Sequence, residues 1–552
     1  MKKRITASIL AMMMLLSCMV TGCGETEPKE VTALSLMEKY NTADQHVTDD
    51  NYRTYYEVFV YSFFDSDGDG IGDLAGLTEK LDYINDGNPK TTKDLGCNGI
   101  WMMPIMPSPS YHKYDVIDYY EIDPEYGTID DFKKLVKECN ERGIRVMIDL
   151  VMNHSSSEHE WFKTACDYLR SLPADAEPDL EECPYVDYYF FSKVAKGGYA
   201  QVPGTDWYYE GQFWSGMPDL NLGNAAVRAE FEAIVDYWLE LGVTGFRLDA
   251  AKEFYSGEDD KNIEILTWFN DMVKSKNEDV YIVAEVWNNM ALYSAYHASG
   301  VSCFNFSFAE NSGTIATAIK EGNGRMFANR LVSAYESFAS FNPDFIDSPF
   351  YTNHDMGRSA GYYSNDYAFQ QVKMAQGMNL LMSGSAFLYY GEEIGMRGSG
   401  RDENKRAPMY WSADEGVKGL CDGPKDMEKF DMKYPSLAEQ EKDGNSIYHF
   451  VKQAILLRNQ FPALSHGVVE ADGALMEDKS IGAMKKTYGD EEVLLIYNLA
   501  AESKIVDLSA VTCMEGELEI SGALLTSAED ILVNEKEITM PAYSVIVLTE
   551  VQ

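Results

Sequence analysis

The feature that most constrains the fold is an alternation of short apolar runs with longer segments of helical periodicity from residue 55 onward. Such alternation indicates repeated strand–helix units. The expected strands are the runs at 55–63, 99–104, 145–151, 245–249, 280–286, 349–353 and 386–391, with a weaker one around 302–308. Eight strands with intervening helices predict an α/β fold of the (β/α)8 TIM-barrel type.

Two parts of the chain depart from this alternation. Residues 155–218 follow the third strand, are too long for an ordinary strand–helix loop, and predict an inserted subdomain B. After a helical segment at 446–461, residues 464–552 contain short apolar runs without helices, which predicts a C-terminal antiparallel β-sandwich. The catalytic barrel is then expected to comprise residues 51–154 and 219–463.

The N-terminus has the pattern of a targeting segment. Lys2, Lys3 and Arg4 precede an apolar stretch that is too short to span a bilayer, so residues 1–22 predict a signal peptide. The segment "VTGC" resembles a bacterial lipobox, which implies acylation of Cys23; an ordinary signal peptide is the alternative. Residues 23–50 are polar and predict a tether. The expected location is the extracellular face of a bacterial membrane, which the chain contacts only through its lipid anchor.

Charge and cysteine content exclude two classes of function. The formal net charge of −43 argues against nucleic-acid binding, because a phosphate backbone would be repelled. No CxxC or His/Cys spacing of a zinc site occurs. For an exported chain, Cys166 and Cys183 either form a local disulfide or remain thiols, and the sequence leaves both open.

Ionisable residues gather where the predicted strands end. The segments are "DLVMNH" (149–154), "GFRLDAAK" (245–252), "AEVW" (284–287) and "TNHD" (352–355). A barrel places its chemistry at the carboxyl ends of its strands, so these side chains are expected at one mouth. A single aspartate after a strand is most often a helix cap. Carboxylates after three different strands favour a catalytic site.

These segments, with "MPDLN" (217–221) and "YYGEEIG" (389–395), resemble in order and separation the motifs of the α-amylase family of glycoside hydrolases. The resemblance implies that Asp249 is the nucleophile, Glu285 the general acid/base, and Asp355 the carboxylate that holds the sugar and stabilises the transition state. Retaining hydrolysis requires such a carboxyl pair. Neighbouring carboxylates and partial burial are expected to raise the pKa of Glu285. The residues implied to bind substrate are Tyr114, Asp115, His154, Arg247, Lys252, His354 and Arg358.

The acidic segment "DSDGDGIGD" (65–73) predicts a calcium site. An EF-hand is excluded, because the twelfth position from Asp65 is Gly76 and a strand precedes the loop. The segment resembles the calcium loop of oligo-1,6-glucosidase-like members, which implies Ca2+ ligands at Asp65, Asp67, Asp69, the Ile71 carbonyl and Asp73. The alternative is an acidic turn without metal. A second calcium site, built in many α-amylases with the counterpart of Asn153 and a histidine carbonyl, stays open because Glu253 replaces the histidine.

The substrate class follows from the residues around the motifs. "LDAAK" resembles endo-acting α-1,4 enzymes, whereas "MPDLN" resembles neopullulanase-like members. The resemblance therefore implies hydrolysis of α-1,4-glucosidic bonds in starch and maltooligosaccharides, with neopullulanase, α-1,6-glucosidase or α-glucanotransferase activity as the alternative. A non-catalytic glucan-binding relative would lack the carboxylates that this chain retains.

Overall fold

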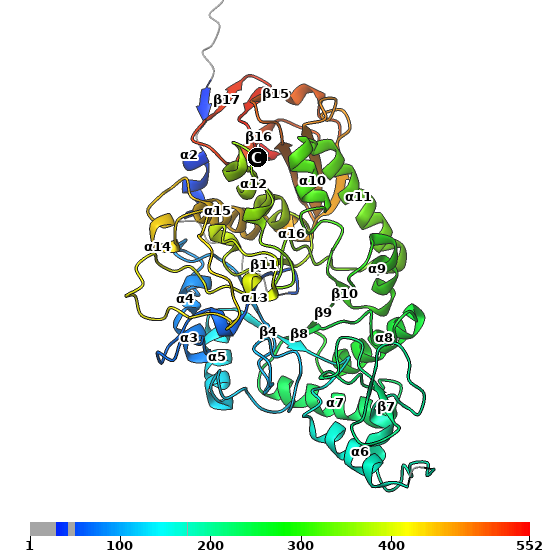
Figure 1. The fold of residues 1–552 in the computed structure, drawn as a ribbon. Helices are drawn as coiled ribbons and strands as arrows, with labels where there is room; N and C mark the ends of the chain where they lie inside the picture. The colour runs from blue at the N-terminus through cyan, green and yellow to red at the C-terminus, as the bar shows by residue number, and fades with distance from the viewer. Residues whose placement is uncertain (1–28, 32, 42–49, 174, 552) are drawn as a thin grey trace, which may run out of the picture.

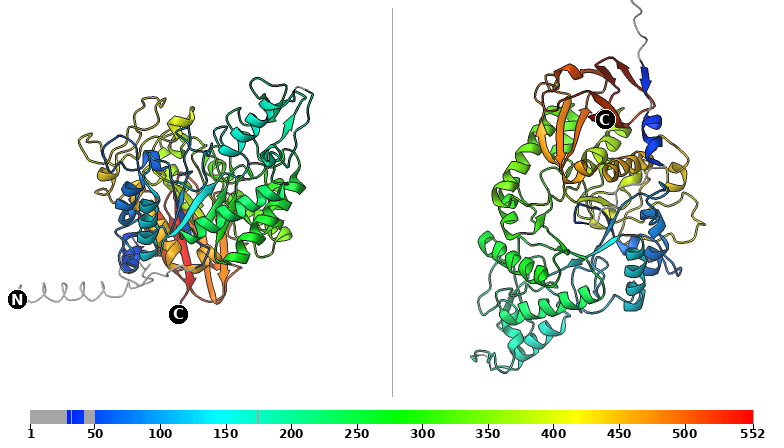
Figure 2. Two further views of the ribbon diagram at one scale, coloured as in Figure 1. Left: turned by 90° about the horizontal axis from the view of Figure 1, so that it is seen from below. Right: turned by 180° about the vertical axis from the view of Figure 1, so that it is seen from behind.

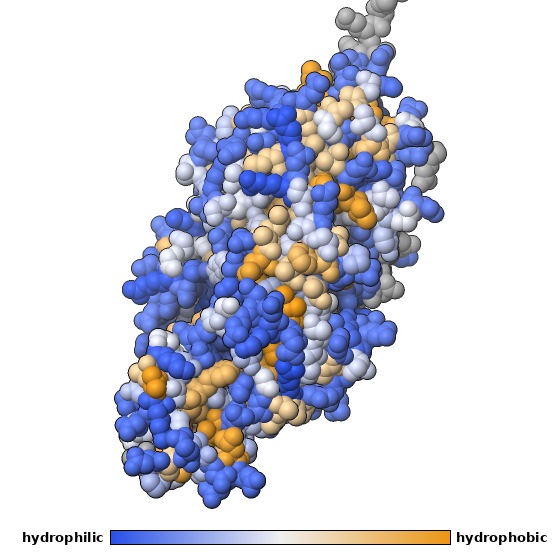
Figure 3. Space-filling model, turned by 90° about the vertical axis from the view of Figure 1, so that its right-hand side faces the viewer, coloured by the Kyte–Doolittle hydropathy of each residue, from blue (hydrophilic) through white to orange (hydrophobic). Residues whose placement is uncertain are grey.

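The computed structural model describes residues 29–31, 33–41, 50–173 and 175–551. The predicted signal peptide and Cys23 lie outside these residues. Within the described ranges, no helix has both the length and the apolar character needed to cross a membrane. The inserted subdomain and the C-terminal domain lie at opposite ends of the barrel (Figure 1). The face drawn in Figure 3 is mostly hydrophilic, with hydrophobic residues in small patches.

Parallel strands form the barrel. In the described part of the chain, seven strands make one sheet in the order β10-β9-β8-β4-β3-β2-β11. Their bounds are β2 (Thr54–Val58), β3 (Gly99–Met102), β4 (Arg145–Leu150), β8 (Gly245–Leu248), β9 (Tyr281–Ala284), β10 (Ser302–Cys303) and β11 (Ala386–Tyr389). Parallel bridges from Phe304 to Ser348 and from Phe350 to Phe387 close the ring. The predicted TIM barrel is confirmed, and the strand expected at 349–353 is reduced to these bridges.

Most barrel strands are shorter than the apolar runs that predict them. The run 55–63 gives a strand only as far as Val58, after which the chain forms the 3-10 turn η2 (Val60–Ser62). Val60 and Phe63 remain as buried as the strand itself. An apolar run therefore indicates burial, and it does not indicate where the extended backbone ends.

Helices cover the outside of the strands (Figure 2). Helix α5 begins at a capping box between Thr128 and Asp131. The segment 446–461 is confirmed as the helix α15, and the helical patterns at 128–143 and 225–242 likewise form α5 and α7. The covering helices are α3 (Leu74–Glu79), α4 (Leu81–Ile84), α5 (Ile129–Glu141), α7 (Ala225–Glu240), α8 (Asp259–Lys276), α9 (Met290–Tyr296), α10 (Thr314–Glu321), α11 (Gly324–Phe341), α12 (Ala368–Leu380) and α15 (Ile447–Gln460); α13 (Asp402–Lys405), α14 (Leu437–Gln440) and α16 (Pro462–His466) are short.

The inserted segment forms a small unit with its own core. It contains α6 (Glu160–Ser171), η3 (Pro184–Tyr188) and an antiparallel sheet of β5 (Phe191–Ser192), β7 (Tyr208–Glu210) and β6 (Tyr199–Gln201). Cys166 and Cys183 are buried free thiols, so the disulfide left open by the sequence is not formed. Cys183 packs in a small apolar cluster with Leu169 and Val186.

The C-terminal domain consists of two antiparallel sheets. Their orders are β12-β13-β14-β19-β16 and β1-β17-β18-β15. The strands are β12 (Val468–Ala471), β13 (Ile481–Tyr488), β14 (Glu491–Asn498), β15 (Lys504–Asp507), β16 (Leu518–Leu525), β17 (Ile531–Asn534), β18 (Glu537–Met540) and β19 (Ser544–Glu550), with β1 (Lys29–Val31) from the N-terminal side. This arrangement agrees with the expected β-sandwich.

Strand β1 lies within the residues that the sequence analysis assigns to a tether. It pairs antiparallel with β17, from Lys29 opposite Val533 to Val31 opposite Ile531, at the top of Figure 1. Helix α2 (Ala33–Glu38) and η1 (Lys39–Asn41) follow, and Met37 and Tyr40 are buried. These described residues are therefore part of the folded domain. The sequence does not reveal this, because the few apolar residues of this segment form too short a pattern to distinguish it from a polar linker.

Two buried basic side chains donate to the end of the barrel helix α12, and one of them, Lys486, comes from the C-terminal domain. On α15, Arg458 Nη1 donates to the carbonyls of Leu380 (2.9 Å) and Met382 (2.6 Å). On β13, Lys486 Nζ donates to the Leu381 carbonyl at 2.6 Å. These carbonyls end helix α12, where backbone acceptors lack helical partners and cations are favoured. The domain contact therefore also completes the end of a barrel helix.

Candidate active site

A cavity of about 560 Å³ lies where the barrel strands end, between the barrel and the inserted subdomain. Asp249 follows β8, Glu285 follows β9, and Asp355 follows the bridging segment 348–350. All three predicted carboxylates line this cavity, as the sequence analysis expects. The full lining is His112, Tyr114, His154, Phe213, Trp214, Met217, Asp249, Ala250, Lys252, Glu253, Glu285, Trp287, Asp355, Asp402 and Arg406.

The buried guanidinium of Arg247 links carboxylates from three strands. Its Nη1 lies 2.9 Å from Asp149 Oδ1 and 2.7 Å from Asp249 Oδ1. Its Nη2 lies 2.9 Å from Glu285 Oε2. Arg247 and Asp249 share a face because side chains alternate along β8. A buried charge requires such pairing, so Arg247 fixes the relative positions of the carboxyl groups.

The surroundings of Glu285 favour the protonated form of its carboxyl group. Burial raises the pKa of its carboxyl above the ordinary value, Arg247 opposes this, and the negative charges of Asp249 and Asp355 add to the rise. The expected direction is confirmed. The Ala250 N–H donates to Glu285 Oε2 at 2.9 Å. Ala250 has φ of 47°, a left-handed conformation that is uncommon for a residue with a Cβ, next to Asp249.

The surroundings of Asp355 favour the ionised form of its carboxyl group, unlike those of Glu285. His354 Nε2 lies 3.0 Å from Asp355 Oδ2, and Arg406 Nη2 lies 2.8 Å from Asp355 Oδ1. Although burial raises its pKa, these cations lower it below the ordinary value overall. His354 Nδ1 lies 2.6 Å from Glu57 Oε1. Burial lowers the pKa of His354, but Asp355 and Glu57 outweigh it and raise the pKa to about 9. At neutral pH, Asp355 is a carboxylate and His354 is an imidazolium.

Three predicted substrate-binding residues line the cavity with Arg247 beneath them. The Tyr114 hydroxyl donates to Asp149 Oδ2 at 3.0 Å, which ties the tyrosine to the Arg247 cluster. His154 Nε2 lies 3.2 Å from the Tyr114 carbonyl, and burial lowers the pKa of His154, so its ring is neutral. Lys252 Nζ forms an ion pair with Glu253 Oε1 at 2.8 Å.

Asp115, His354 and Arg358 are buried and do not line the cavity, so their contact with substrate stays a prediction. Asp115 is 1% exposed and accepts hydrogen bonds from the Ser108 and Ser110 hydroxyls. Arg358 Nη1 donates to the Tyr390 carbonyl at 2.6 Å, beneath the surface. His354 is 0% exposed and positions Asp355 instead. Adjacency to a motif in sequence cannot tell which side chain faces the cavity and which one supports it.

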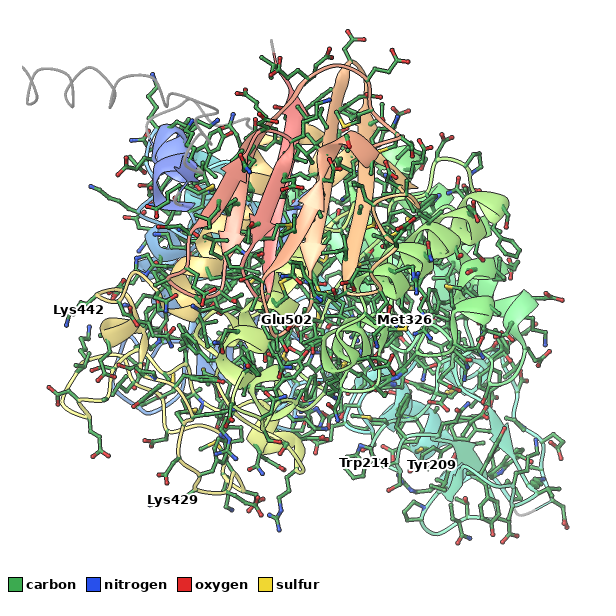
Figure 4. All side chains as sticks on the ribbon, turned by 90° about the horizontal axis from the view of Figure 1, so that it is seen from above. Tyr209, Trp214, Met326, Lys429, Lys442 and Glu502 are labelled. Carbon is green, nitrogen blue, oxygen red and sulfur yellow. The ribbon has the colours of Figure 1, made fainter. Side chains whose placement is uncertain are left out.

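Several lining residues are absent from the sequence predictions. Arg406 lies in the long segment after β11, outside every motif. Phe213, Trp214 and Trp287 are 51%, 54% and 45% exposed, so part of each ring can contact a ligand, although one face of Trp287 is stacked on Phe306. Figure 4 labels Trp214 on the inserted subdomain near Tyr209. The signal in the sequence that could identify such a lining residue is an aromatic residue beside a motif: Trp287 follows Glu285 by two residues.

The acidic loop after β2 brings three of its carboxylates together. Oxygens of Asp65, Asp67 and Asp73 lie within 4.8 Å of one another. Backbone N–H groups of Gly68 and Gly70 donate to Asp65, which offsets part of the negative charge. The Asp69 carboxylate accepts from the Ile71 N–H at 2.8 Å and, like Ile71, is outside this group. A set of hard carboxylate oxygens fits the ligand preference of Ca2+.

Comparison with known proteins agrees with this geometry. The family model described as "Alpha amylase, catalytic domain" matches residues 57–467. The chain is 38% identical to "Alpha-amylase 3" of Dictyoglomus thermophilum over 81% of this chain and 84% of that protein. It is similar to the solved structure "Eubacterium rectale Amy13B" with a TM-score of 0.89 and 48% identity, covering 95% of this chain and 100% of that chain. An α-amylase structure from H. orenii matches with a TM-score of 0.79 and 35% identity, covering 91% and 100%.

The elevated pKa of His354 predicts a loss of stability at alkaline pH. Its folded pKa of about 9 lies above the ordinary value of 6.5, so the stabilisation is complete below pH 6.5 and is lost as the pH rises through 9. The expected size is about 3 kcal/mol. Thermal unfolding at pH 6.5 and 9.5 should show a larger fall in Tm for the parent than for His354→Gln. An equal fall in both proteins would contradict the prediction.

Proposed function

Because the chain belongs to the α-amylase family of glycoside hydrolases, we propose that Asp249, Glu285 and Asp355 carry out the retaining hydrolysis of α-1,4-glucosidic bonds in starch and maltooligosaccharides. The observation that carries the proposal is the shared cavity of the three carboxylates, with Arg247 bridging two of them. The family assignment gives the reaction class, and the geometry of these residues gives each of them a role.

The two carboxyl groups paired with Arg247 divide the chemistry. Asp249 attacks the anomeric carbon while the bond between that carbon and the leaving oxygen breaks. Glu285 donates its carboxyl proton to the leaving oxygen. Glu285 then takes a proton from water, whose oxygen displaces Asp249 from the sugar. Because its pKa is raised, the carboxyl group of Glu285 favours the protonated form that the first step requires. The hydrogen bond from the Ala250 N–H orients the Glu285 carboxylate for the second step.

Asp355 completes the site as an ionised group beside the sugar. Its side chain is 28% exposed, so an oxygen can accept hydrogen bonds from sugar hydroxyls. Its negative charge stabilises the positive charge that develops at the anomeric carbon. Arg406 and His354 keep it deprotonated and in place. His354 and Arg406 are therefore positioning residues in this mechanism.

The alternative activity on α-1,6 bonds keeps specific support. The chain is 26% identical to "Oligo-1,6-glucosidase" of Parageobacillus thermoglucosidasius, over 86% of this chain and 95% of that protein. The α-amylases named above are more similar, and exposed aromatics on two sides of the cavity favour an extended chain over a disaccharide. Endo-hydrolysis of α-1,4 bonds is therefore the main proposal.

Glu285→Gln should lower kcat on amylose by about 10²–10⁴-fold, because the amide cannot donate the proton. Binding of maltoheptaose, measured by calorimetry, should persist. The exposed Glu240→Gln is the matched control and should behave like the parent. Full hydrolysis by Glu285→Gln would overturn the assignment, and efficient release of products from pullulan by the parent would replace the α-1,4 proposal with the alternative.

We also propose that the acidic loop binds Ca2+ as a structural ion. Asp65, Asp67 and Asp73 would hold it, and Asp69 and the Ile71 carbonyl, implied by the family resemblance, would complete the shell after a small rearrangement of the loop. Asp73 also caps α3 by accepting from the Gly76 N–H at 2.7 Å. The ion would offset carboxylate repulsion and secure the start of the first barrel helix.

Chelation should therefore destabilise the protein. At calcium 100 times above its dissociation constant, the ion should add about 2.7 kcal/mol to the free energy of unfolding. Differential scanning calorimetry with EDTA and with added calcium should show a reversible change in Tm. Asp67→Asn should reduce this change, whereas Asp130→Asn, at an exposed acid on α5, should not. A parent Tm that is insensitive to both additives would contradict the proposal.

Acylation of Cys23 is our proposal for how the protein is held at the extracellular face of its membrane. Only residues 24–28 separate Cys23 from β1, and β1 pairs with β17. Six residue steps reach about 20 Å at most, so the anchor would keep the C-terminal domain near the bilayer. Starch degradation at that face suits an enzyme whose substrate is too large to enter the cell.

Cys23→Ser should move the protein from the membrane fraction to the soluble fraction of cells that express the full chain, because the acylated thiol is lost. Blotting of both fractions checks this, and Cys421→Ser is the control, since that thiol lies in the folded part. If the parent itself is found only in the soluble fraction, the anchor does not exist.

A further inference from the structure

Two sequence motifs contain large buried side chains that no step of the proposed mechanism uses. Arg358 follows Asp355 in "NHDMGR", and Tyr389 and Tyr390 begin "YYGEEIG". Each of these three residues is at most 1% exposed. Burying a guanidinium costs free energy unless its surroundings compensate its charge and its N–H groups. The partners of Arg358 therefore show which part of the structure it stabilises.

The Arg358 guanidinium bridges two segments of backbone. Its Nη1 donates to the Tyr390 carbonyl at 2.6 Å, directly after β11, and its Nε donates to the Lys405 carbonyl at 3.1 Å, at the end of α13. Glu392 Oε1 lies 3.8 Å from Nη1, and the rings of Tyr389 and Tyr390 lie 4.3 and 4.8 Å from the guanidinium carbon. Both kinds of contact compensate the positive charge. Arg358 therefore fixes the end of α13 relative to the end of β11.

The two tyrosines hold the same segment on both sides of Arg406. The Tyr389 hydroxyl donates to the Lys405 carbonyl at 3.2 Å. The Tyr390 hydroxyl donates to the Ala407 carbonyl at 2.7 Å. The backbone carbonyls immediately before and after Arg406 are thus both held by buried side chains from the end of β11.

Arg406 extends from this held backbone to the active site. Its Nη2 lies 2.8 Å from Asp355 Oδ1, and its Nε donates to the His354 carbonyl at 3.3 Å. A long side chain with several rotatable bonds places its charged end precisely only when its own backbone and contacts are fixed. The contacts around Arg406 therefore determine how firmly its guanidinium holds Asp355.

We propose that Arg358 and Tyr390 are positioning residues for the reaction, because they hold the backbone on either side of Arg406 and thereby place its guanidinium against Asp355. The inference rests on the proposed function, in which Asp355 stabilises the positive charge at the anomeric carbon. That stabilisation depends on a charge placed in advance, so a small displacement of Asp355 weakens it. Arg358 then acts from behind Asp355, whereas the family resemblance implies that it contacts substrate.

A double-mutant cycle separates positioning through Arg406 from a general effect on folding. Tyr390→Phe removes only the hydroxyl that holds the Ala407 carbonyl, and the substitution is made both in the parent and in Arg406→Gln. Tyr40→Phe is the matched control, because its buried hydroxyl also donates to a backbone carbonyl, that of Ser521 in the C-terminal domain. The measurements are kcat and KM on maltoheptaose and the Tm of every variant.

In the parent, Tyr390→Phe should lower kcat/KM by about two- to ten-fold, the equivalent of one net hydrogen bond, mainly through kcat. In Arg406→Gln, the same substitution should change kcat/KM by less than about two-fold, because the group that Tyr390 positions is gone. Tyr40→Phe should lower Tm and leave kcat/KM as in the parent. An equal loss in both backgrounds, or a Tyr390→Phe variant as active as the parent, would overturn the inference. A parent that does not hydrolyse maltoheptaose would instead refute the proposed function.

Arg358→Lys tests the other contact with this backbone. It keeps the positive charge, but a single ammonium group cannot replace the planar fork that reaches both carbonyls. It should lower kcat/KM by about 10- to 100-fold in the parent, since misplaced catalytic groups cost activity steeply. In Arg406→Gln, most of this loss should disappear. A loss that persists there in full would mean that Arg358 acts on the substrate directly, and it would overturn the positioning role.

Discussion

The buried guanidinium of Arg247 is the constraint on which the site depends. Asp149 at the end of β4, Asp249 after β8 and Glu285 after β9 all contact it. Carboxylates buried without a counter-charge would destabilise the fold, so their pairing with one cation fixes how these strands end relative to one another. Since the guanidinium is planar with donors in fixed directions, it also fixes the separation of the nucleophile from the acid. Loss of Arg247 would therefore affect folding and chemistry together.

A second buried cation gives the opposite wall a different electrostatic character. Glu57 on β2 forms an ion pair with the His354 imidazolium. His354 and Arg406 in turn form ion pairs with Asp355. The pKa of Asp355 is lowered by these cations, whereas that of Glu285 is raised by burial and by the other carboxylates. Carboxyl groups in one cavity thus take different protonation states because their surroundings differ. The closed barrel makes this possible, since β2 and β9 approach the cavity from different sides.

The sequence predicts the parts of this arrangement that follow from strand order and motif. Residues after consecutive strands must meet at one mouth, which is why Asp249, Glu285 and Asp355 could be placed together. Arg406 could not be found this way, because its segment contains no strand. The sequence cannot show that Asp115 accepts from the Ser108 hydroxyl and that Arg358 donates to the Lys405 carbonyl, because neither partner belongs to a motif. Strand β1 was missed because three residues of pairing leave no periodic pattern.

The end of β4 couples the substrate-binding subdomain to the chemistry. Leu220 N–H donates to the Asn153 carbonyl at 2.8 Å, and Asn153 Nδ2 donates to Asp219 Oδ1 at 3.2 Å. The return of the inserted chain is thereby fastened beside Asp149 and His154. Phe213 and Trp214 lie only a few residues before that junction, so these hydrogen bonds help to position their rings relative to the end of β4. In the proposed function, a sugar chain on these aromatics would take a fixed position relative to the carboxylates through these hydrogen bonds.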